Sequence, residues 1–520
     1  MRAGIDLGTT RTVVAAVDRG NYPVLGFEDA LGDPHEHIPS VVALHDGRLV
    51  CGWAALAAGE EGAPLVRSFK RMLSRADATA ETPVRFGDRT RTLGEALAAF
   101  AAHVVEQIDA PDDLQVVLGV PANAHSAQRL LTLDAFARTG ADVIALVNEP
   151  SAGAFEFTHR HPRTVTSRRT RVVVYDLGGG TFDGSLVDVA GTEHTVERSI
   201  GVARLGGDDF DEVLARLALA KAGRRLEDVD AYEAVRALEA SRIVKERLAP
   251  QSRRMLIELD DQDVTVGVDD FYAAATPLVE RSIDALRPLL GGGADVGQGA
   301  DGDSRADAGP RSDDGIAVDG TTVGPPAADA ADLAGIYLVG GASSLPLVGR
   351  TLRAEFGRRV HRSPYPSAST AIGLAIAADP DSGYRLRDRL ARGIGVFREA
   401  RSGAEVTFDP LVAPGAAPAD DGSLSVIRRY RAAHNVGWFR FVEFAAADAH
   451  GEATGDLTAL AEIVVPFDPA LRDGRDLTTV PVERRDGGPM VEETVSVDAN
   501  GIATIRVALD DGYVAERSVG

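Results

Sequence analysis

Residues 171–189, RVVVYDLGGGTFDGSLVDV, carry residue types suited to phosphate chemistry. Asp176, the glycines at 178–180, Thr181 and Asp183 separate two apolar segments that predict strands. Glycines allow backbone to approach a ligand closely, and a turn of free N–H groups beside hydroxyls and carboxylates suits phosphates with Mg²⁺. A plain glycine-rich hairpin turn accounts for this stretch equally well when it is taken alone.

The start of the chain contains a second turn of the same kind between two apolar segments. Residues 4–10, GIDLGTT, place Asp6, Gly8, Thr9 and Thr10 after a short apolar segment, and another apolar segment follows. Two Asp-Leu-Gly hairpins with threonines in one chain indicate two halves of a single phosphate clamp.

Composition limits the class of protein. A chain of 520 residues with 44% apolar content predicts a folded, soluble protein of two or more domains. A net charge of −23 argues against nucleic-acid binding, which needs a basic surface. The single cysteine, Cys51, excludes an internal disulfide framework and a cysteine zinc site, and we expect it to be a small buried side chain. With neither a signal-peptide pattern nor an apolar run of ~20 residues, the expected location is the cytoplasm, away from membranes.

Lysine is scarce enough to be informative. Of 55 basic residues only Lys70, Lys221 and Lys245 are lysines. Where arginine is the default, a lysine indicates a site that needs a compact ammonium group rather than a planar guanidinium.

Strands and helices are predicted to alternate up to residue 380, which favours an α/β domain with a mixed sheet. The predicted helices cover 92–108, a segment opening near Ser126, another opening at Pro150, a segment ending near Ala220, 231–248 and 371–378, and the predicted strands cover 116–120, 143–147, 171–175, 185–189 and 336–339.

Two changes of pattern mark other regions. Residues 291–332 are nearly devoid of large apolar residues, which predicts a flexible insertion. After Asp379 period-2 alternation predicts short strands, with a hairpin signal within 494–509, so residues 394–520 are expected to form an all-β sandwich. The aromatic residues of this part are expected to fill its core: Phe439, Phe441 and Phe444.

The hairpins and three further motifs occur in one order: NEPSAGA at 148–154, LGGDDFD at 205–211 and YLVGGASSLPLV at 337–348. In this order the chain resembles the seventy-kilodalton heat-shock chaperone family of the DnaK type. The resemblance implies an actin-like ATPase domain, with the duplicated ribonuclease-H-like α/β fold, at 1–380. A linker at 381–393 and a peptide-binding β-sandwich at 394–520 would follow.

The resemblance also implies roles for particular residues. Phosphates would lie between Gly8, Thr9 and Thr10 on one side and Gly179, Gly180 and Thr181 on the other. Asp6 and Asp176 would hold Mg²⁺ through its waters. Lys70 and Glu149 would stand beside the attacking water, and Thr181 would bond the γ-phosphate. Lys245, Gly341 and Ser343 would bind the adenosine, and Pro121 and Arg129 would relay the nucleotide state towards the sandwich.

The chain departs from the family pattern at several positions. Arg242, Ser344 and Ser367 stand where the family has a glutamate, an arginine and an aspartate around adenosine, which predicts weaker nucleotide binding. The linker segment YRLRDRLAR, 384–392, is rich in arginine where the family has an apolar run. No segment long enough for the family's helical lid follows the sandwich, so we expect rapid exchange of bound peptide.

The resulting prediction is a slow cytoplasmic ATPase that uses ATP and Mg²⁺ to regulate binding of unfolded or extended peptide. The family implies a J-domain co-chaperone and a nucleotide-exchange factor as partners. Two alternatives stay open: a nucleotide-sensing interaction module with little turnover, and a small-molecule kinase on the same core.

Overall fold

Each of the two Asp-Leu-Gly hairpins begins a sheet of its own. In the computed structural model, which describes residues 1–109, 113–259, 262–290, 332–401, 405–448 and 452–518, the first hairpin joins β1 (Arg2–Leu7) to β2 (Arg11–Ala16). β1 pairs in parallel with β11 (Gln115–Val120), and β11 with β12 (Asp142–Asn148). With β5 (Ile38–Pro39) at the other edge, the order is β12-β11-β1-β2-β5.

The second hairpin repeats this topology. β13 (Arg171–Leu177) pairs antiparallel with β14 (Thr181–Ala190) and parallel with β18 (Leu333–Val339), which is followed by β19 (Val360–Arg362). β15 (Glu193–Ala203) and β20 (Arg385–Arg387) complete the order β19-β18-β13-β14-β15-β20. The same arrangement of two parallel strands beside a hairpin thus occurs twice, as the predicted duplicated actin-like fold requires. We refer to residues 1–160 as the first lobe and to 171–378 as the second lobe.

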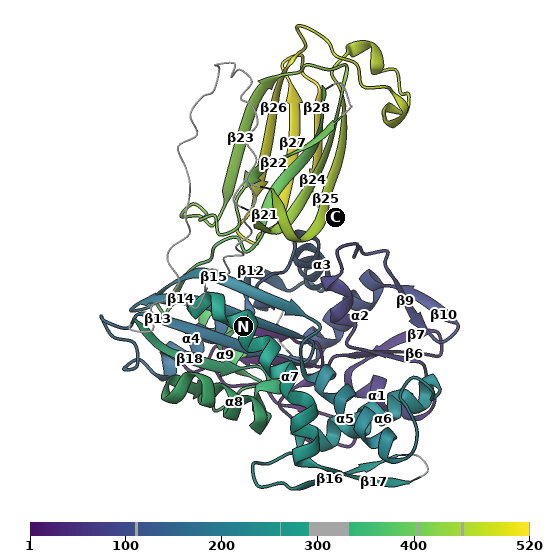
Figure 1. The fold of residues 1–520 in the computed structure, drawn as a ribbon, viewed down its shortest axis with the longest axis vertical. Helices are drawn as coiled ribbons and strands as arrows, with labels where there is room; N and C mark the ends of the chain where they lie inside the picture. Colours follow the sequence, from purple (N-terminus) through teal and green to yellow (C-terminus); the bar gives the residue numbers. More distant parts are fainter. Residues whose placement is uncertain (110–112, 260–261, 291–331, 402–404, 449–451, 519–520) are drawn as a thin grey trace, which may run out of the picture.

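Two helices lie between the lobes' sheets. α4 (Glu149–Arg160) packs on β13 and α9 (Ser369–Ala378) packs on β1, and the two helices pack on each other (Figure 1). Their contact is so close that a Cβ on Gly373 would lie 1.8 Å from the carbonyl oxygen of Ala152. Glycine at this position therefore sets the spacing of the lobes.

The remaining elements of the lobes surround these sheets. In the first lobe they are β3 (Phe27–Glu28), β4 (Pro34–His35), β6 (Val41–His45), β7 (Arg48–Cys51), α1 (Gly52–Glu60), β8 (Leu65–Arg67), η1 (Phe69–Ser74), β9 (Pro83–Phe86), β10 (Arg89–Thr92), α2 (Leu93–Gln107) and α3 (Ser126–Ala137). In the second lobe they are α5 (Gly207–Lys221), α6 (Ala231–Glu246), β16 (Arg254–Glu258), β17 (Asp263–Gly267), α7 (Val268–Leu286), η2 (Arg287–Leu290), η3 (Gly341–Ser344), α8 (Pro346–Phe356) and η4 (Gly357–Arg359).

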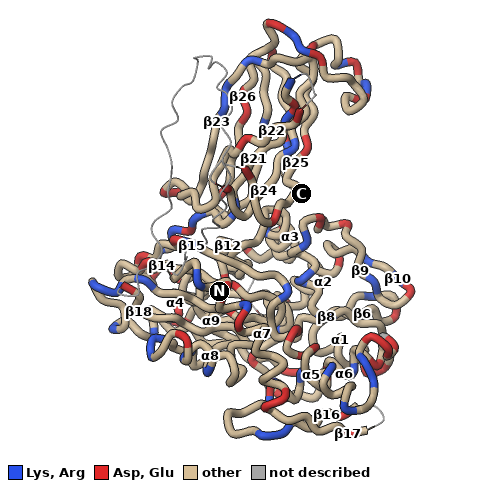
Figure 2. Tube along the Cα trace, viewed as in Figure 1, with Lys and Arg blue, Asp and Glu red and all other residues tan. Residues whose placement is uncertain are grey.

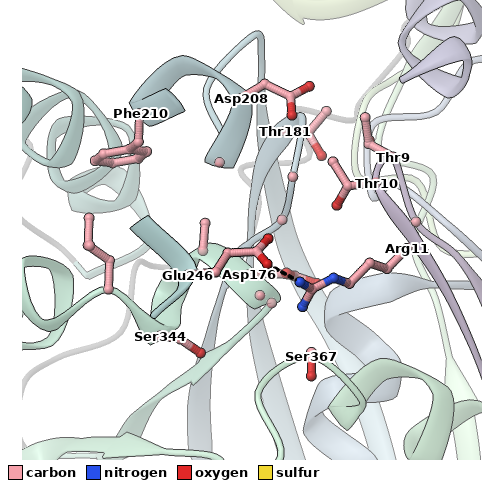
Figure 3. A pocket seen from close by; sticks show the side chains of 18 of the residues that line it. Thr9, Thr10, Arg11, Asp176, Thr181, Asp208, Phe210, Glu246, Ser344 and Ser367 are labelled. Carbon is pink, nitrogen blue, oxygen red and sulfur yellow. Dashed lines mark hydrogen bonds and ion pairs between the residues drawn. The ribbon is translucent and has the colours of Figure 1, made fainter. Parts of the chain in front are cut away.

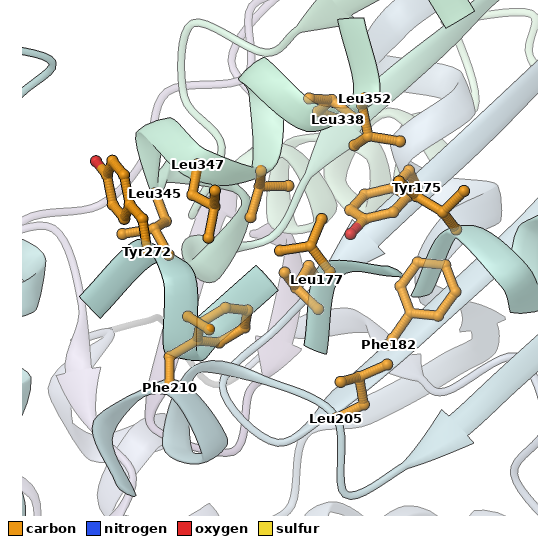
Figure 4. Packing of buried hydrophobic residues seen from close by; sticks show 14 of the residues in the cluster. Tyr175, Leu177, Phe182, Leu205, Phe210, Tyr272, Leu338, Leu345, Leu347 and Leu352 are labelled. Carbon is orange, nitrogen blue, oxygen red and sulfur yellow. The ribbon is translucent and has the colours of Figure 1, made fainter. Parts of the chain in front are cut away.

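The core of the second lobe supports its phosphate hairpin from beneath. Tyr175 and Leu177 on β13 and Phe182 on β14 are at most 1% exposed, and Phe210 of α5 joins the same cluster (Figure 4). Burial of these side chains fixes the strand ends from which the polar residues of the turn project.

A sandwich of two four-stranded sheets forms the β-domain, residues 393–518 (Figure 1). One sheet has the order β22-β21-β24-β25 and the other β23-β26-β27-β28. Its elements are β21 (Gly393–Ala400), β22 (Glu405–Val412), β23 (Leu424–Arg431), β24 (Val436–Ala447), β25 (Ala453–Pro466), η6 (Pro469–Leu471), η7 (Leu477–Thr479), β26 (Met490–Val497), β27 (Ala503–Leu509) and β28 (Val514–Ser518). Phe439, Phe441 and Phe444 are at most 3% exposed, which confirms the prediction that they fill a core.

Several details differ from the predictions. Strand β14 begins at Thr181 rather than Ser185, because its ladder with β13 continues up to the glycine turn. Residues 385–387, within the predicted linker, form β20 and pair with β15. The predicted insertion at 291–332 lies outside the described residues except for Asp332. Within the described parts of the chain, none of the helices has the length and apolar content needed to cross a membrane.

Candidate functional site

The two glycine-threonine hairpins face each other across a cleft between the lobes. A Cβ on Gly179 would lie 2.7 Å from the side chain of Thr10, and one on Gly180 would lie 2.8 Å from that of Thr9. Only glycine fits this approach, and it brings the backbones of the two hairpins close together at one end of the cleft. The cavity there measures about 220 Å³ (Figure 3).

Lys70 lies at the floor of this cleft among buried carboxylates. Its ammonium group donates to Glu149 Oε1 at 2.7 Å, and its side chain is 7% exposed. Burial alone lowers the pKa of Lys70, but the charges of Glu149 and Asp6 outweigh that effect and raise it. Lys70 is therefore a permanently charged cation held by the first residue of α4.

Three more carboxyl groups share this space: Asp6, Asp176 and Asp183. Burial, followed by the charge of Glu149, raises the pKa of Asp6 to about 7 and that of Asp183 to about 7. The same causes hold the pKa of Asp176 well above its usual range. With Lys70 and Glu149 these residues form what we call the carboxylate cluster, in which four acids face one lysine.

This imbalance fits a divalent cation. Asp6 and Asp176 both line the cavity, and no described side chain donates a hydrogen bond to either carboxylate. Among the described residues no group of three His, Cys, Asp or Glu side chains forms a complete metal cage. Two carboxylates that leave most of the coordination to water and phosphate are what Mg²⁺ prefers.

The position of Lys70 depends on a short 3₁₀ helix, η1. Ser68, just before it, adopts a left-handed backbone with φ of 52° and donates from Oγ to Asp208 at 2.8 Å. Phe69 packs against Phe100 of α2 with ring centroids 5.3 Å apart, which anchors the turn in the first lobe. The turn that presents Lys70 is therefore fixed from both lobes.

The opposite end of the cavity is filled with ion pairs of the second lobe. Lys245 on α6 donates to the carbonyl of Gly207 at 2.7 Å and pairs with Asp211 at 2.5 Å. Arg242, one turn earlier, contacts Asp211 at 3.0 Å and Asp208 at 2.8 Å. The charged groups at the predicted adenosine end are thus paired with one another, whereas four acids face one lysine at the phosphate end.

Most of the predicted site residues lie around this cavity. Those among its lining residues are Asp6, Gly8, Thr9, Thr10, Lys70, Glu149, Asp176, Gly179, Thr181, Lys245 and Gly341. Gly180 and Ser343 are not among them: the carbonyl of Gly180 accepts from Arg71, and the buried hydroxyl of Ser343 donates to the carbonyl of Gly340.

Ion pairs that no local pattern predicted join the two lobes across the cleft. First-lobe arginines face second-lobe carboxylates in each case: Arg11 pairs with Glu246, Arg67 with Glu239, and Arg71 with Asp208 and Asp209. Asp208 and Asp209 belong to the LGGDDFD motif, so the sequence could have indicated that they lie at the site. For Arg11 the sequence offers only its position directly after Thr10.

A second set of contacts joins the first lobe to the β-domain. Glu443 on β24, 5% exposed, accepts from the backbone N–H of Ser126 at 3.2 Å and from its hydroxyl at 2.5 Å. Ser126 is the first residue of α3, so the carboxylate neutralises the positive end of that helix. Arg392, 7% exposed, lies 3.7 Å from the same carboxylate.

The predicted relay residue Arg129 belongs to this interface. It donates to the carbonyl of Asn500 in the β-domain at 3.2 Å and to the side chain of Asn148 at 2.7 Å. Asn148 in turn donates to Asp388, which precedes the β-domain. Arg129, Asn148 and Asp388 border a cavity of about 560 Å³ between the lobes and the β-domain.

Comparison with known proteins agrees with this architecture. The family model described as "Hsp70 protein" matches residues 94–287. The chain is 31% identical over 423 residues to Chaperone protein HscA of Edwardsiella ictaluri, and this covers 76% of the chain and 62% of that relative. It is 31% identical over 400 residues to the Chaperone protein HscA homolog of Methylibium petroleiphilum, covering 72% of the chain and 57% of that relative. The chain therefore spans about three fifths of the length of these relatives, and over most of its own length it is similar to chaperones of this kind.

Proposed function

We propose that this protein is an ATP-dependent chaperone of the cytoplasm that hydrolyses ATP slowly to control its hold on extended peptide. The observation that carries the proposal is the pair of facing glycine-threonine hairpins with Lys70 and Glu149 between them. The relatives named above are described as chaperones, which supports the same function. The interspersed acidic and basic residues along the chain suit a protein whose ligand is not a nucleic acid (Figure 2).

Hydrolysis would depend on positioning and charge neutralisation, the main needs of phosphoryl transfer. Backbone N–H groups at Thr9, Thr10 and Gly179 would hold the phosphates, since the N–H of Gly8 already donates to the carbonyl of Asp6. The Thr181 hydroxyl would donate to the γ-phosphate. Glu149 would keep Lys70 beside the attacking water, where its charge offsets the negative charge that develops on the phosphoryl oxygens. Asp6 and Asp176 would hold Mg²⁺, which when bound supplies further neutralisation of phosphate charge.

Coupling to the β-domain would pass through two consecutive residues. Asn148 contacts Arg129 and Asp388 at the interface, and Glu149 contacts Lys70 in the carboxylate cluster. A change at the γ-phosphate that moves Glu149 would therefore change the hydrogen bonds of Asn148. Such coupling requires that the docked and undocked arrangements of the β-domain favour different nucleotides. A J-domain co-chaperone and an exchange factor would act on these same equilibria.

One observation favours a second candidate, a nucleotide-sensing module with little turnover. The adenosine end of the cleft is occupied by the ion pairs of Arg242 and Lys245 with Asp211. A nucleoside must displace or accommodate these pairs, which would weaken binding.

The decisive experiment is fluorescence anisotropy of a labelled, unfolded apolar peptide with the protein in ATP and then in ADP, alongside single-turnover hydrolysis. The chaperone function predicts measurable turnover and peptide exchange several times faster in one nucleotide than in the other. Equal affinity and equal exchange rates in both nucleotides would contradict it. Tight ATP binding without turnover or peptide binding would favour the sensing module.

Docking of the β-domain is expected to depend on pH through Asp388. Burial raises the pKa of Asp388 to about 6, against ~3.9 for a free aspartate. The docked state then binds more protons than the undocked state between about pH 4 and 6, so docking should strengthen as the pH falls through 6. The full shift corresponds to about 3 kcal/mol at most.

Small-angle scattering between pH 5 and 8 measures this effect as a change in the radius of gyration, and Asp388→Asn serves as the comparison. His125 at the same interface has a pKa lowered by burial, so its protonation opposes docking as the pH falls. The difference between wild type and Asp388→Asn isolates the carboxyl group. Identical pH profiles for the two proteins would contradict the assignment.

A further inference from the structure

The pair formed by Arg11 and Glu246 spans the mouth of the cleft. Arg11 directly follows Thr10 in the first phosphate hairpin, whereas Glu246 ends α6 of the second lobe, next to Lys245 (Figure 3). Both line the same cavity as the phosphate residues, and their side chains are 36% and 38% exposed. Each lobe thus contributes one partner, and both remain accessible to a ligand.

Arg11 differs from the other planar side chains that line the cavity. Phe210 is fully buried in the core of the second lobe, so its ring cannot turn into the cleft. Arg242 is fixed by carboxylates on two sides, Asp208 and Asp211. Among the described residues, Glu246 is the hydrogen-bond partner of the Arg11 guanidinium, and it contacts the edge of that group. A guanidinium held by its edge keeps both faces available for stacking.

The part of the cavity lining that the second lobe supplies is partly apolar. It includes Leu248, Ala342 and Leu345, besides the ion-paired Arg242 and Lys245. A planar cation from one lobe and aliphatic side chains from the other make a slot suited to an aromatic ring. One face of the ring would attract the cation, and the other face would be buried from water against the aliphatic groups.

We propose that Arg11 is a base-binding residue that stacks its guanidinium, held by Glu246, on the nucleobase of a nucleoside di- or triphosphate. The proposal rests on the proposed function, which places the phosphates between the two hairpins. It adds that base recognition is shared between lobes, with the cation supplied by the first lobe. A bound base would then draw the two lobes together, since neither lobe alone forms the whole slot.

Isothermal titration with Mg·ADP and with magnesium tripolyphosphate separates contacts to the base from contacts to phosphate. Arg11→Ala is expected to weaken ADP binding about tenfold, as loss of a desolvated cation–π contact does, and to change tripolyphosphate binding less than twofold. Arg11→Lys should behave like Arg11→Ala, because an ammonium group keeps the charge but has no plane. Glu246→Gln should give a smaller loss confined to ADP.

Arg85→Ala is the matched control, since Arg85 is exposed on β9 and lies outside the cavity lining. Equal losses for ADP and tripolyphosphate in Arg11→Ala, with recovery in Arg11→Lys, would make Arg11 a phosphate or lobe-closing contact and overturn the proposal. Unchanged ADP affinity in Arg11→Ala would overturn it as well. A wild-type protein that binds neither ligand would overturn the proposed function, and this assignment with it.

Discussion

Lys70→Ala is expected to slow single-turnover ATP hydrolysis by about 10²–10³-fold while most nucleotide binding is retained. Lys70 is the one cation of the carboxylate cluster, and its ammonium group is fixed by Glu149 at 2.7 Å. Binding is spread over the backbone of two hairpins, whereas neutralisation of charge beside the attacking water depends on this one side chain. The loss should therefore fall on the chemical step rather than on affinity.

Rapid-quench measurement of one turnover, with the ADP dissociation constant measured in parallel, tests this prediction. Lys221→Ala is the matched control, because Lys221 is 44% exposed and pairs with Asp270 on the surface of the second lobe. Lys70→Arg should recover little, since a planar guanidinium does not fit the place of a compact ammonium. Thr181→Ala should also slow turnover. Normal turnover in both Lys70→Ala and Thr181→Ala would mean that the hydrolytic centre lies elsewhere.

Glu443→Ala is expected to release the β-domain from the first lobe. The carboxylate accepts two hydrogen bonds from Ser126 at the start of α3 and lies beside the buried Arg392. Its removal leaves the helix end without its anion and leaves Arg392 with Asp456 as its remaining carboxylate partner. Removing one partner of a buried charged contact costs about 3 kcal/mol. That energy corresponds to a shift in the docking equilibrium on the order of a hundredfold.

Hydrogen exchange at the Ser126 amide and the radius of gyration in solution report this release. Ser126→Ala should produce part of the effect, and the double variant should lose less than the sum because the two residues share one contact. Glu462→Ala, an exposed glutamate on neighbouring β25, controls for loss of charge in the same sheet. A compact Glu443→Ala protein with a protected Ser126 amide would show that other contacts hold the domains together.

The features that the sequence predicted well are local in the chain. Each phosphate hairpin is a strand, a turn and a strand within about twenty residues, so its glycines and threonines can be read together. The start of α3 at Ser126 and the end of α9 at Ala378 were predicted from local patterns for the same reason, although α9 begins two residues before the predicted 371. The burial of Phe439 and Phe441 followed from period-2 alternation along β24.

The contacts that the sequence did not predict join residues far apart in the chain. Arg11 and Glu246 are separated by 235 positions, and Ser126 and Glu443 by 317, so no local pattern links either pair. Side-chain direction was not predicted either: Ser343 lies in a motif next to the cleft, and its hydroxyl donates back to the carbonyl of Gly340. Neither ion pairing across a cleft nor the rotation of one hydroxyl can be inferred from spacing alone.

The burial of Cys51 has a practical consequence for measuring the proposed movement of the β-domain. The thiol is 5% exposed, and burial raises its pKa to about 12, so almost none of it is the reactive thiolate at neutral pH. Maleimide dyes should therefore leave the native cysteine unmodified. Cysteines introduced at exposed positions such as Glu106 on α2 and Ser425 on β23 can be labelled in the otherwise unaltered chain, so that energy transfer between the dyes follows the β-domain through each turnover.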